Sequence, residues 1–269
     1  MRKLEGKVAV ITGASKGIGE GIAKVYAKYG AKLVLAARGA RVLEFAEELR
    51  AAGYEAIGVR TDVTNKESVL NLVKQALDTY GTIDVLVNNA GVCVLGDLLS
   101  TSDEDRDYHI DINIKGVWNV TRAIAPIMMA KREGKIVVMS SVTGDMVADP
   151  GEAAYAMSKA ALVGFTKAVA REMADYNITV NAICPGYVRT PMVEGMAKQS
   201  CPENPESVID GIAAGVPLKR LARPEEIGEL AAFLGCYESS YITGAQIVID
   251  PCFFLPQCLR LLSAAASLC

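Results

Sequence analysis

The stretch that decides the fold lies near the N-terminus and reads Thr12-Gly13-Ala14-Ser15-Lys16-Gly17-Ile18-Gly19. It follows a run rich in β-branched residues (7–12) and precedes a segment with helical spacing (17–29). Glycines allow a tight turn and a close approach of the backbone to a bound group. The start of the following helix offers free N–H groups to an anion. This strand–loop–helix order predicts a site for a dinucleotide pyrophosphate, with a plain tight turn as the alternative.

The same alternation of strands and helices continues along the chain. Strands are expected at 7–12, 32–37, 56–60, 83–88, 135–140, 179–184 and 246–250. Helices are expected at 17–29, 41–52, 66–80, 103–131, 154–176 and 224–234. Such alternation predicts parallel strands joined by right-handed crossovers. We therefore expect an α/β fold, a doubly wound Rossmann fold in a single domain (1–250), with about seven parallel strands and helices on both faces.

The composition argues against several other classes of protein. With 28 basic and 31 acidic side chains the net charge is −3, and no basic block predicts nucleic-acid binding. No apolar run reaches the ~18 residues of a membrane span and no secretory segment is apparent, so we expect a cytoplasmic protein that binds no membrane. His109, the single histidine, leaves no multi-histidine metal site and no Ser-His-Asp triad. We expect no metal, and a structural, partly buried His109.

Unusual residues gather at the carboxyl ends of the expected strands, where open parallel sheets bind ligands. The second strand ends in Ala37 and Arg38, where NAD-binding sheets usually carry an acid. Arg38 and Lys16 can pair with a 2′-phosphate, which favours NADP(H) over NAD(H); the alternative is two solvated surface cations. Asp62 can accept from an adenine amino group or be a plain loop carboxylate. Asn88-Asn89-Ala90-Gly91 is expected to contact the cofactor beside the glycine loop, with a plain turn as the alternative.

The pattern that carries chemistry is Ser141 followed by Tyr155 and Lys159. Tyr155 and Lys159 are four residues apart and project from one helix face. A tyrosine titrates near pH ~10 when unperturbed, but an ammonium one turn away favours the phenolate and lowers that pKa. The pair can therefore act as a general acid/base without histidine, with Ser141 hydrogen-bonded to a substrate oxygen.

With TGxxxGxG, NNAG and YxxxK in order, the chain resembles the short-chain dehydrogenase/reductase family over roughly residues 5–250. The resemblance implies a catalytic tetrad of Asn113, Ser141, Tyr155 and Lys159, in which the Asn113 carbonyl holds a water of a proton relay. The resemblance also implies nicotinamide contacts from residues after the sixth strand. With the contacts argued above, the expected cofactor-binding residues are Gly13, Ser15, Lys16, Gly17, Ile18, Gly19, Arg38, Asp62, Val63, Asn89, Ala90, Gly91, Tyr155, Lys159, Pro185, Gly186, Val188 and Thr190.

The implied activity is that of an NADP(H)-dependent oxidoreductase that transfers a hydride between the nicotinamide and a carbonyl or secondary alcohol. A catalytically silent dinucleotide-binding sensor is the alternative, although such relatives tend to lose the tyrosine or lysine kept here. We expect a lid at 191–215 whose Met192, Val193 and Met196 form an apolar wall for a small-to-medium substrate.

The segments 103–131 and 154–176 resemble the helices through which family members form homodimers and homotetramers. Pro126 is expected to kink or interrupt the first of them.

The C-terminal segment departs from the family pattern. Relatives commonly end the last strand with Asp-Gly-Gly, whereas this chain continues from Asp250 to Pro251. Residues 251–269 contain one charge, Arg260, and three of the seven cysteines. We expect either an apolar tail that docks on a partner subunit or a tail produced by a shifted reading frame.

Overall fold

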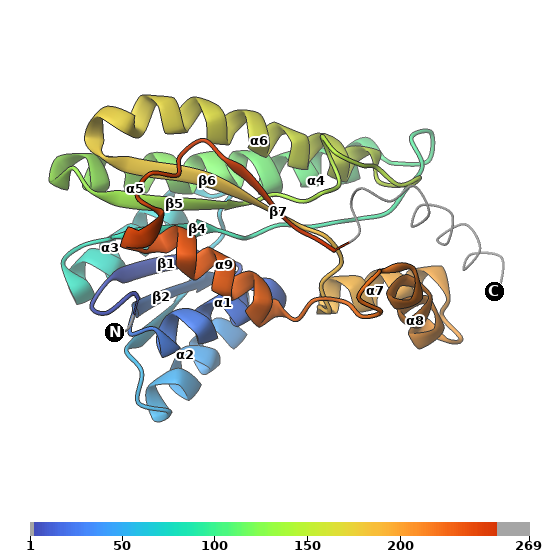
Figure 1. Cartoon of the computed structure of the whole chain (residues 1–269), viewed down its shortest axis with the longest axis horizontal. Helices are drawn as coiled ribbons and strands as arrows, with labels where there is room; N and C mark the ends of the chain where they lie inside the picture. Colours follow the sequence, from blue (N-terminus) through green and yellow to red (C-terminus); the bar gives the residue numbers. More distant parts are fainter. Residues whose placement is uncertain (1–2, 252–269) are drawn as a thin grey trace.

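The protein is built on a parallel sheet of seven strands, seen in a computed structural model that describes residues 3–251 (Figure 1). The strand order is β3-β2-β1-β4-β5-β6-β7. The strands are β1 (Val8–Thr12), β2 (Lys32–Ala37), β3 (Ala56–Arg60), β4 (Val85–Asn88), β5 (Gly134–Met139), β6 (Ile178–Pro185) and β7 (Gln246–Ile249). The expected α/β Rossmann architecture is confirmed.

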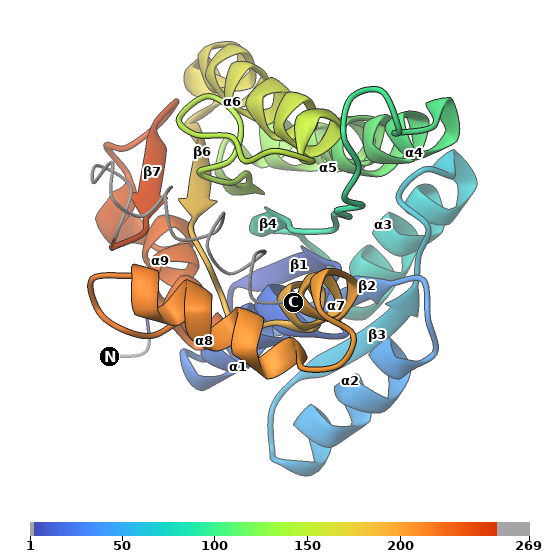
Figure 2. The same ribbon diagram turned by 90° about the vertical axis from the view of Figure 1, so that its right-hand side faces the viewer.

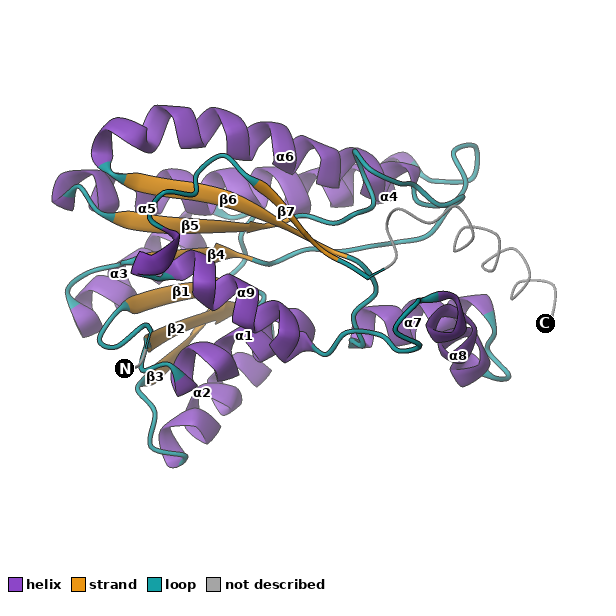
Figure 3. Ribbon diagram, in the orientation of Figure 1, coloured by secondary structure: helices purple, strands orange, loops and turns teal. Residues whose placement is uncertain are grey.

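Helices cover both faces of the sheet (Figure 3). They are α1 (Gly17–Lys28), α2 (Arg41–Ala51), α3 (Lys66–Tyr80), α4 (Asp103–His109), α5 (Gly116–Lys131), α6 (Ala153–Met173), α7 (Pro191–Ser200), α8 (Pro205–Gly215) and α9 (Pro224–Gly235), with short turns at Ala174–Tyr176 and Tyr237–Ser239. Side chains alternate between two cores: Ala9 and Ile11 pack with α1, α2 and α9, while Val8 and Val10 pack with α3, α5 and α6. Burial on both faces explains the continuous apolar strands.

The segment expected as one helix over 103–131 is interrupted, but not at Pro126. A π-helical turn (Ile110–Lys115) separates α4 from α5, and α5 continues through Pro126. π-Turns within helices are rare and frequent at functional sites. Asn113 lies within this turn, so the interruption falls at a predicted tetrad residue.

The segment 191–215 forms two helices beyond the carboxyl ends of the strands (Figure 2). Both begin with proline at the first helical position, after the capping side chains of Thr190 and Asn204. A small core of Ala197, Ile209 and Leu221 joins them.

In residues 3–251, no helix is long and apolar enough to cross a membrane. The structure describes Pro251, which is exposed. Both expectations for the tail concern residues outside the described range.

Candidate active site

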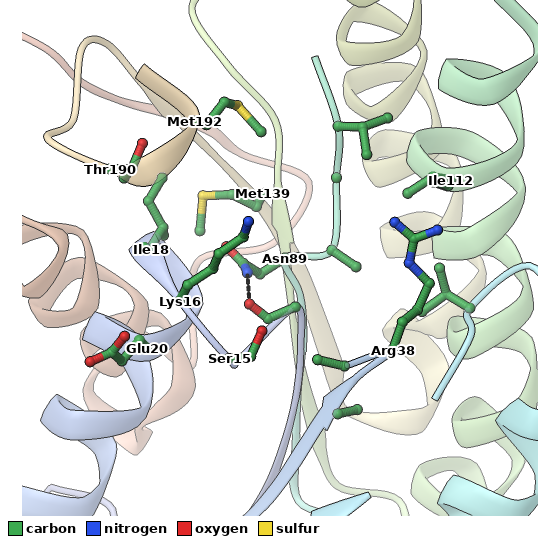
Figure 4. A pocket seen from close by; sticks show the side chains of 18 of the residues that line it. Ser15, Lys16, Ile18, Glu20, Arg38, Asn89, Ile112, Met139, Thr190 and Met192 are labelled. Atoms are coloured by element: carbon green, nitrogen blue, oxygen red, sulfur yellow. Dashed lines mark hydrogen bonds between the residues drawn. The ribbon is translucent and has the colours of Figure 1, made fainter. Parts of the chain in front are cut away.

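A cavity of about 720 Å³ opens at the carboxyl ends of the central strands (Figure 4). Most predicted cofactor contacts line it: Gly13, Ser15, Lys16, Gly17, Ile18, Arg38, Asp62, Val63, Asn89, Ala90, Gly91, Tyr155, Lys159 and Thr190. Met192, which was expected in the substrate wall, also lines the cavity, while sequence reasoning missed other lining residues, including Glu20, Arg41, Thr61, Val92 and Ile112. The strand-end rule thus located the cavity, while its walls also draw on helices.

The glycine loop is shaped so that only glycine fits at two of its positions. Gly13 adopts φ +65°, and a Cβ there would lie 2.9 Å from the Ala90 Cα. A Cβ on Gly19 would lie 2.3 Å from the Gly13 carbonyl oxygen. Gly19 allows the loop to fold back on the start of α1, but, unlike the other predicted contacts of this loop, it does not line the cavity. The resulting backbone cradle beside a helix N-terminus suits a pyrophosphate.

Thr12 joins the glycine loop to the segment that follows β4. Its Oγ1 accepts hydrogen bonds from the N–H groups of Asn89 and Ala90, both at 3.0 Å. The amide of Asn89 donates in return to the carbonyls of Thr12 at 3.0 Å and Gly13 at 3.2 Å. Asn89 thus fixes two loops. Sequence reasoning missed Thr12, whose only signal was a hydroxyl ending a buried strand.

Arg38 lies at the other end of the cavity, immediately after β2 (Figure 4). Its guanidinium donates to the Tyr108 hydroxyl at 3.0 Å and lies 6.0 Å from the centre of that ring. Neither Arg38 nor Lys16 forms an ion pair with a carboxylate among residues 3–251, whereas nearby Arg41 is held by Glu48. Two exposed cations therefore stay available to an anionic group.

Asp62 occupies a turn after β3. Its Oδ1 accepts from both the backbone N–H and the hydroxyl of Thr64, at 2.9 and 2.8 Å. The carboxylate therefore orders this loop at the cavity wall, leaving its second oxygen for the adenine contact proposed from the sequence.

Helix α6 brings Lys159 and Tyr155 to the same rim of the cavity. Lys159 is buried, donates to the Met139 carbonyl at 2.9 Å, and lies 5.6 Å from the centre of the Tyr155 ring. Burial lowers the pKa of Lys159 to about 8, so this ammonium loses its proton far more easily than an exposed lysine.

The Tyr155 hydroxyl is held as a neutral phenol, so the lowered pKa expected from the sequence is wrong for this structure. The side chain is partly exposed, but desolvation of its hydroxyl raises the pKa, and a hydrogen bond with Ser141 opposes this. The Ser141 Oγ accepts from the Thr143 N–H at 3.1 Å, which leaves its own hydrogen to donate. A neutral phenol beside a serine donor is suited to giving a proton to an oxygen atom.

The side chain of Asn113 is fully engaged in structure. Its Oδ1 accepts from the Val92 N–H at 2.8 Å, and its amide donates to the Val92 carbonyl at 3.0 Å and the Ser158 hydroxyl at 2.9 Å. A Cβ on Gly91 would lie 3.3 Å from the Asn113 Oδ1 and 3.4 Å from the Lys159 Nζ. Asn113 therefore joins the segment after β4 to α6, and only its main chain is left for a relay.

Three predicted nicotinamide contacts are outside the lining of this cavity, as are Asn113 and Ser141. Pro185 pairs with Ile249 of β7, and Val188 is buried in the core. Gly186 lies so close to Asp250 that a Cβ would be 2.2 Å from its carboxylate oxygen. The structure thus brings together fourteen of the eighteen predicted cofactor contacts in one cavity.

No group of three or more possible metal-binding side chains occurs among residues 3–251.

Known proteins resemble this chain over nearly its whole length. A family model described as enoyl-(acyl carrier protein) reductase matches residues 13–251. Oxidoreductase UcpA of Salmonella typhimurium is 59% identical, covering 96% of this chain and 98% of the relative. The 3-oxoacyl-[acyl-carrier-protein] reductase FabG of Thermotoga maritima is 39% identical, covering 92% and 98%. The structure of L-sorbose reductase from Gluconobacter frateurii, complexed with NADPH and L-sorbose, aligns with a TM-score of 0.88 at 33% identity, covering 94% and 98%.

Proposed function

Because the chain belongs to the short-chain dehydrogenase/reductase family of oxidoreductases, which bind a nicotinamide dinucleotide, we propose that it is an NADP(H)-dependent carbonyl reductase or alcohol dehydrogenase. The observation that carries the proposal is the convergence of Tyr155, Lys159 and Ser141 beside the glycine-loop cavity. Asn113 is the fourth member of the proposed tetrad.

In the reductive direction, NADPH held by the glycine loop and Arg38 would supply a hydride to the carbonyl carbon. Ser141 donates a hydrogen bond to the substrate oxygen and orients it. Tyr155 gives its phenolic proton to that oxygen as charge develops there. The Lys159 ammonium stabilises the resulting phenolate and holds ribose hydroxyls. Oxidation runs the same steps in reverse.

The preference for NADP(H) is supported by Arg38 and Lys16. Both line the cavity without a carboxylate partner among the described residues, and β2 is followed by a cation instead of an acid. A 33% identical neighbour in structure, an L-sorbose reductase, was solved with NADPH. Arginine matches phosphate geometry in a way that a ribose hydroxyl does not require.

We also propose that residues 1–250 form the catalytic domain and that α7 and α8 close over a small-to-medium carbonyl or alcohol. Met192 lines the cavity wall on this side. A screen of aldehydes, ketones, sugars and sterols, followed through NADPH absorbance, tests the activity. Tight NADPH binding with no turnover of any of these would contradict the proposal and favour the silent sensor.

The affinity for NADPH should weaken as the pH rises through about 8. Because burial lowers the pKa of Lys159 from 10.5 to about 8, its ammonium is lost in this range, while an ordinary lysine stays charged. The dissociation constant, measured by NADPH fluorescence between pH 7 and 9.5, should rise above pH 8 in the wild type. Lys159→Arg, whose guanidinium stays charged, should remove that rise. The same rise in both proteins would assign it to another group.

We propose a homodimer or homotetramer assembled through α5 and α6. Trp118 on α5 is 54% exposed and Met157 on α6 is 48% exposed, and the Trp118 ring centre lies 6.1 Å from that of Phe165. A surface tryptophan beside a phenylalanine suits an interface. Trp118→Glu should lower the mass measured by light scattering, whereas Leu70→Glu, at an exposed residue on α3, should leave it unchanged. A monomeric wild type would refute this assembly.

A further inference from the structure

His109 is fully buried at the end of α4 and has no part in the mechanism above. Its Nδ1 lies 2.7 Å from the Asp105 carbonyl oxygen, and its Nε2 lies 3.1 Å from the Val94 nitrogen. A carbonyl can only accept and a backbone N–H can only donate. The ring is therefore the neutral tautomer with hydrogen on Nδ1, and both nitrogens are engaged. His109 is fully buried, where the sequence predicted a partly buried structural histidine, and both of its ring nitrogens hold the surrounding main chain.

The partner of His109, Val94, belongs to the segment after β4 whose Val92 lines the cavity. Asn113, four residues further along, binds both backbone groups of Val92, and His109 binds the backbone of Val94. Two side chains on one face of α4 and the π-turn thus hold the main chain on either side of Cys93. Further on, the Gly96 N–H donates to the Gly151 carbonyl at 2.9 Å, which joins the segment to the loop before α6.

His109 also contacts the proposed acid directly. Its ring centre lies 6.4 Å from that of Tyr155, with the two planes inclined by 67°, an edge-to-face arrangement that aromatic pairs favour. One buried ring therefore touches the phenol on one side and holds the neighbouring main chain on another.

We propose that His109 is a positioning residue that fixes Tyr155 and the Val92–Val94 main chain as the wall against which the carbonyl substrate is oriented. This inference rests on the proposed function. The glycine loop and Arg38, which are proposed to bind the phosphates of NADPH, lie elsewhere in the cavity. Loss of the His109 contacts should therefore lower kcat/KM for the carbonyl substrate and leave the affinity for NADPH unaffected.

Three substitutions separate the contacts. His109→Gln can place an amide oxygen near the Nε2 position and keep an acceptor for Val94, while His109→Asn loses that acceptor and His109→Leu loses both partners. An unpaired N–H buried at Val94 would destabilise the main chain that forms this wall. With 2,3-butanedione as the carbonyl probe, His109→Leu and His109→Asn should lose about tenfold or more in kcat/KM, and His109→Gln should stay within about threefold. The Kd for NADPH should change by less than about twofold in all three.

Tyr26→Phe is the matched control for lost stability. It removes a buried hydrogen bond from the Tyr26 hydroxyl to the Ala231 carbonyl, 2.8 Å long, between α1 and α9. A merely structural His109 would make its variants behave like this control, with a lower Tm and unchanged kcat/KM per folded molecule. That result would overturn the inference.

A second measurement does not depend on activity. Because the chain has one histidine, tag-free protein labelled with ¹⁵N-histidine gives the nitrogen signals of His109 alone. We expect the Nδ1–H tautomer, and the Nε2–H tautomer would overturn the anchoring role by itself. A wild type that reduces no carbonyl would instead overturn the proposed function, and with it the kinetic part of the inference.

Discussion

Replacing Tyr155 with phenylalanine is expected to lower kcat by about 10³-fold, since a positioned general acid contributes about 10²–10⁴-fold. The hydroxyl is the one group at this rim that is both a neutral acid and hydrogen-bonded to Ser141, among the residues that the structure describes. The ring itself packs against His109, and phenylalanine preserves that contact. The loss should therefore fall on the proton-transfer step and not on the architecture of the site.

NADPH binding distinguishes this outcome from misfolding. Most of the cofactor cavity is formed by the glycine loop and the ends of β2 to β4, so the Kd of Tyr155→Phe for NADPH should stay within about threefold of the wild type. Tyr26→Phe makes the same chemical change away from the site and should keep its turnover. Substantial turnover by Tyr155→Phe would remove Tyr155 from its role as acid.

Features of this site that depend on neighbouring residues could be predicted from the sequence, whereas features that depend on contacts between distant residues could not. The glycine loop and the Tyr155–Lys159 pair follow from spacing within one turn or one helix face, so the sequence alone located them. The approximate strand positions follow from apolar runs in the same way. The start of β4 does not, because only Val85–Val87 pair with β1, and that register depends on a partner far along the chain.

The π-turn and the hydrogen-bond partners of Thr12 and His109 could not be predicted from the sequence. Asn113 binds Val92, 21 residues away, and Thr12 binds Asn89, 77 residues away. The apolar periodicity over 103–131 does not reveal the π-turn, because that turn is held by a contact with a residue outside the helix. Pro126 does not interrupt the helix, since α5 continues through it, and whether a proline ends a helix depends on the surrounding packing as well as on the residue.

Arg38 is expected to determine the choice of cofactor. The wild type should use NADPH with a higher kcat/KM than NADH, and Arg38→Ala should lose about 10- to 100-fold with NADPH while changing little with NADH. A hydrogen bond to a charged group contributes about 1.5–3 kcal/mol, and 1.4 kcal/mol corresponds to tenfold. Lys16→Ala should lose less, because an ammonium lacks the bidentate geometry of a guanidinium.

Arg41→Ala is the matched control, because Arg41 lines the same cavity but is bound in two hydrogen bonds by Glu48. If NADPH were attracted only by the general positive charge of the cavity, Arg41→Ala and Arg38→Ala would lower the affinity for NADPH by the same factor. Binding of 2′,5′-ADP against 5′-ADP isolates the contact, since the two differ only in that phosphate. Equal affinity of the wild type for both, or a preference for NADH in turnover, would contradict the assignment. The cation after β2 would then be an exposed arginine stacked on Tyr108 and nothing more.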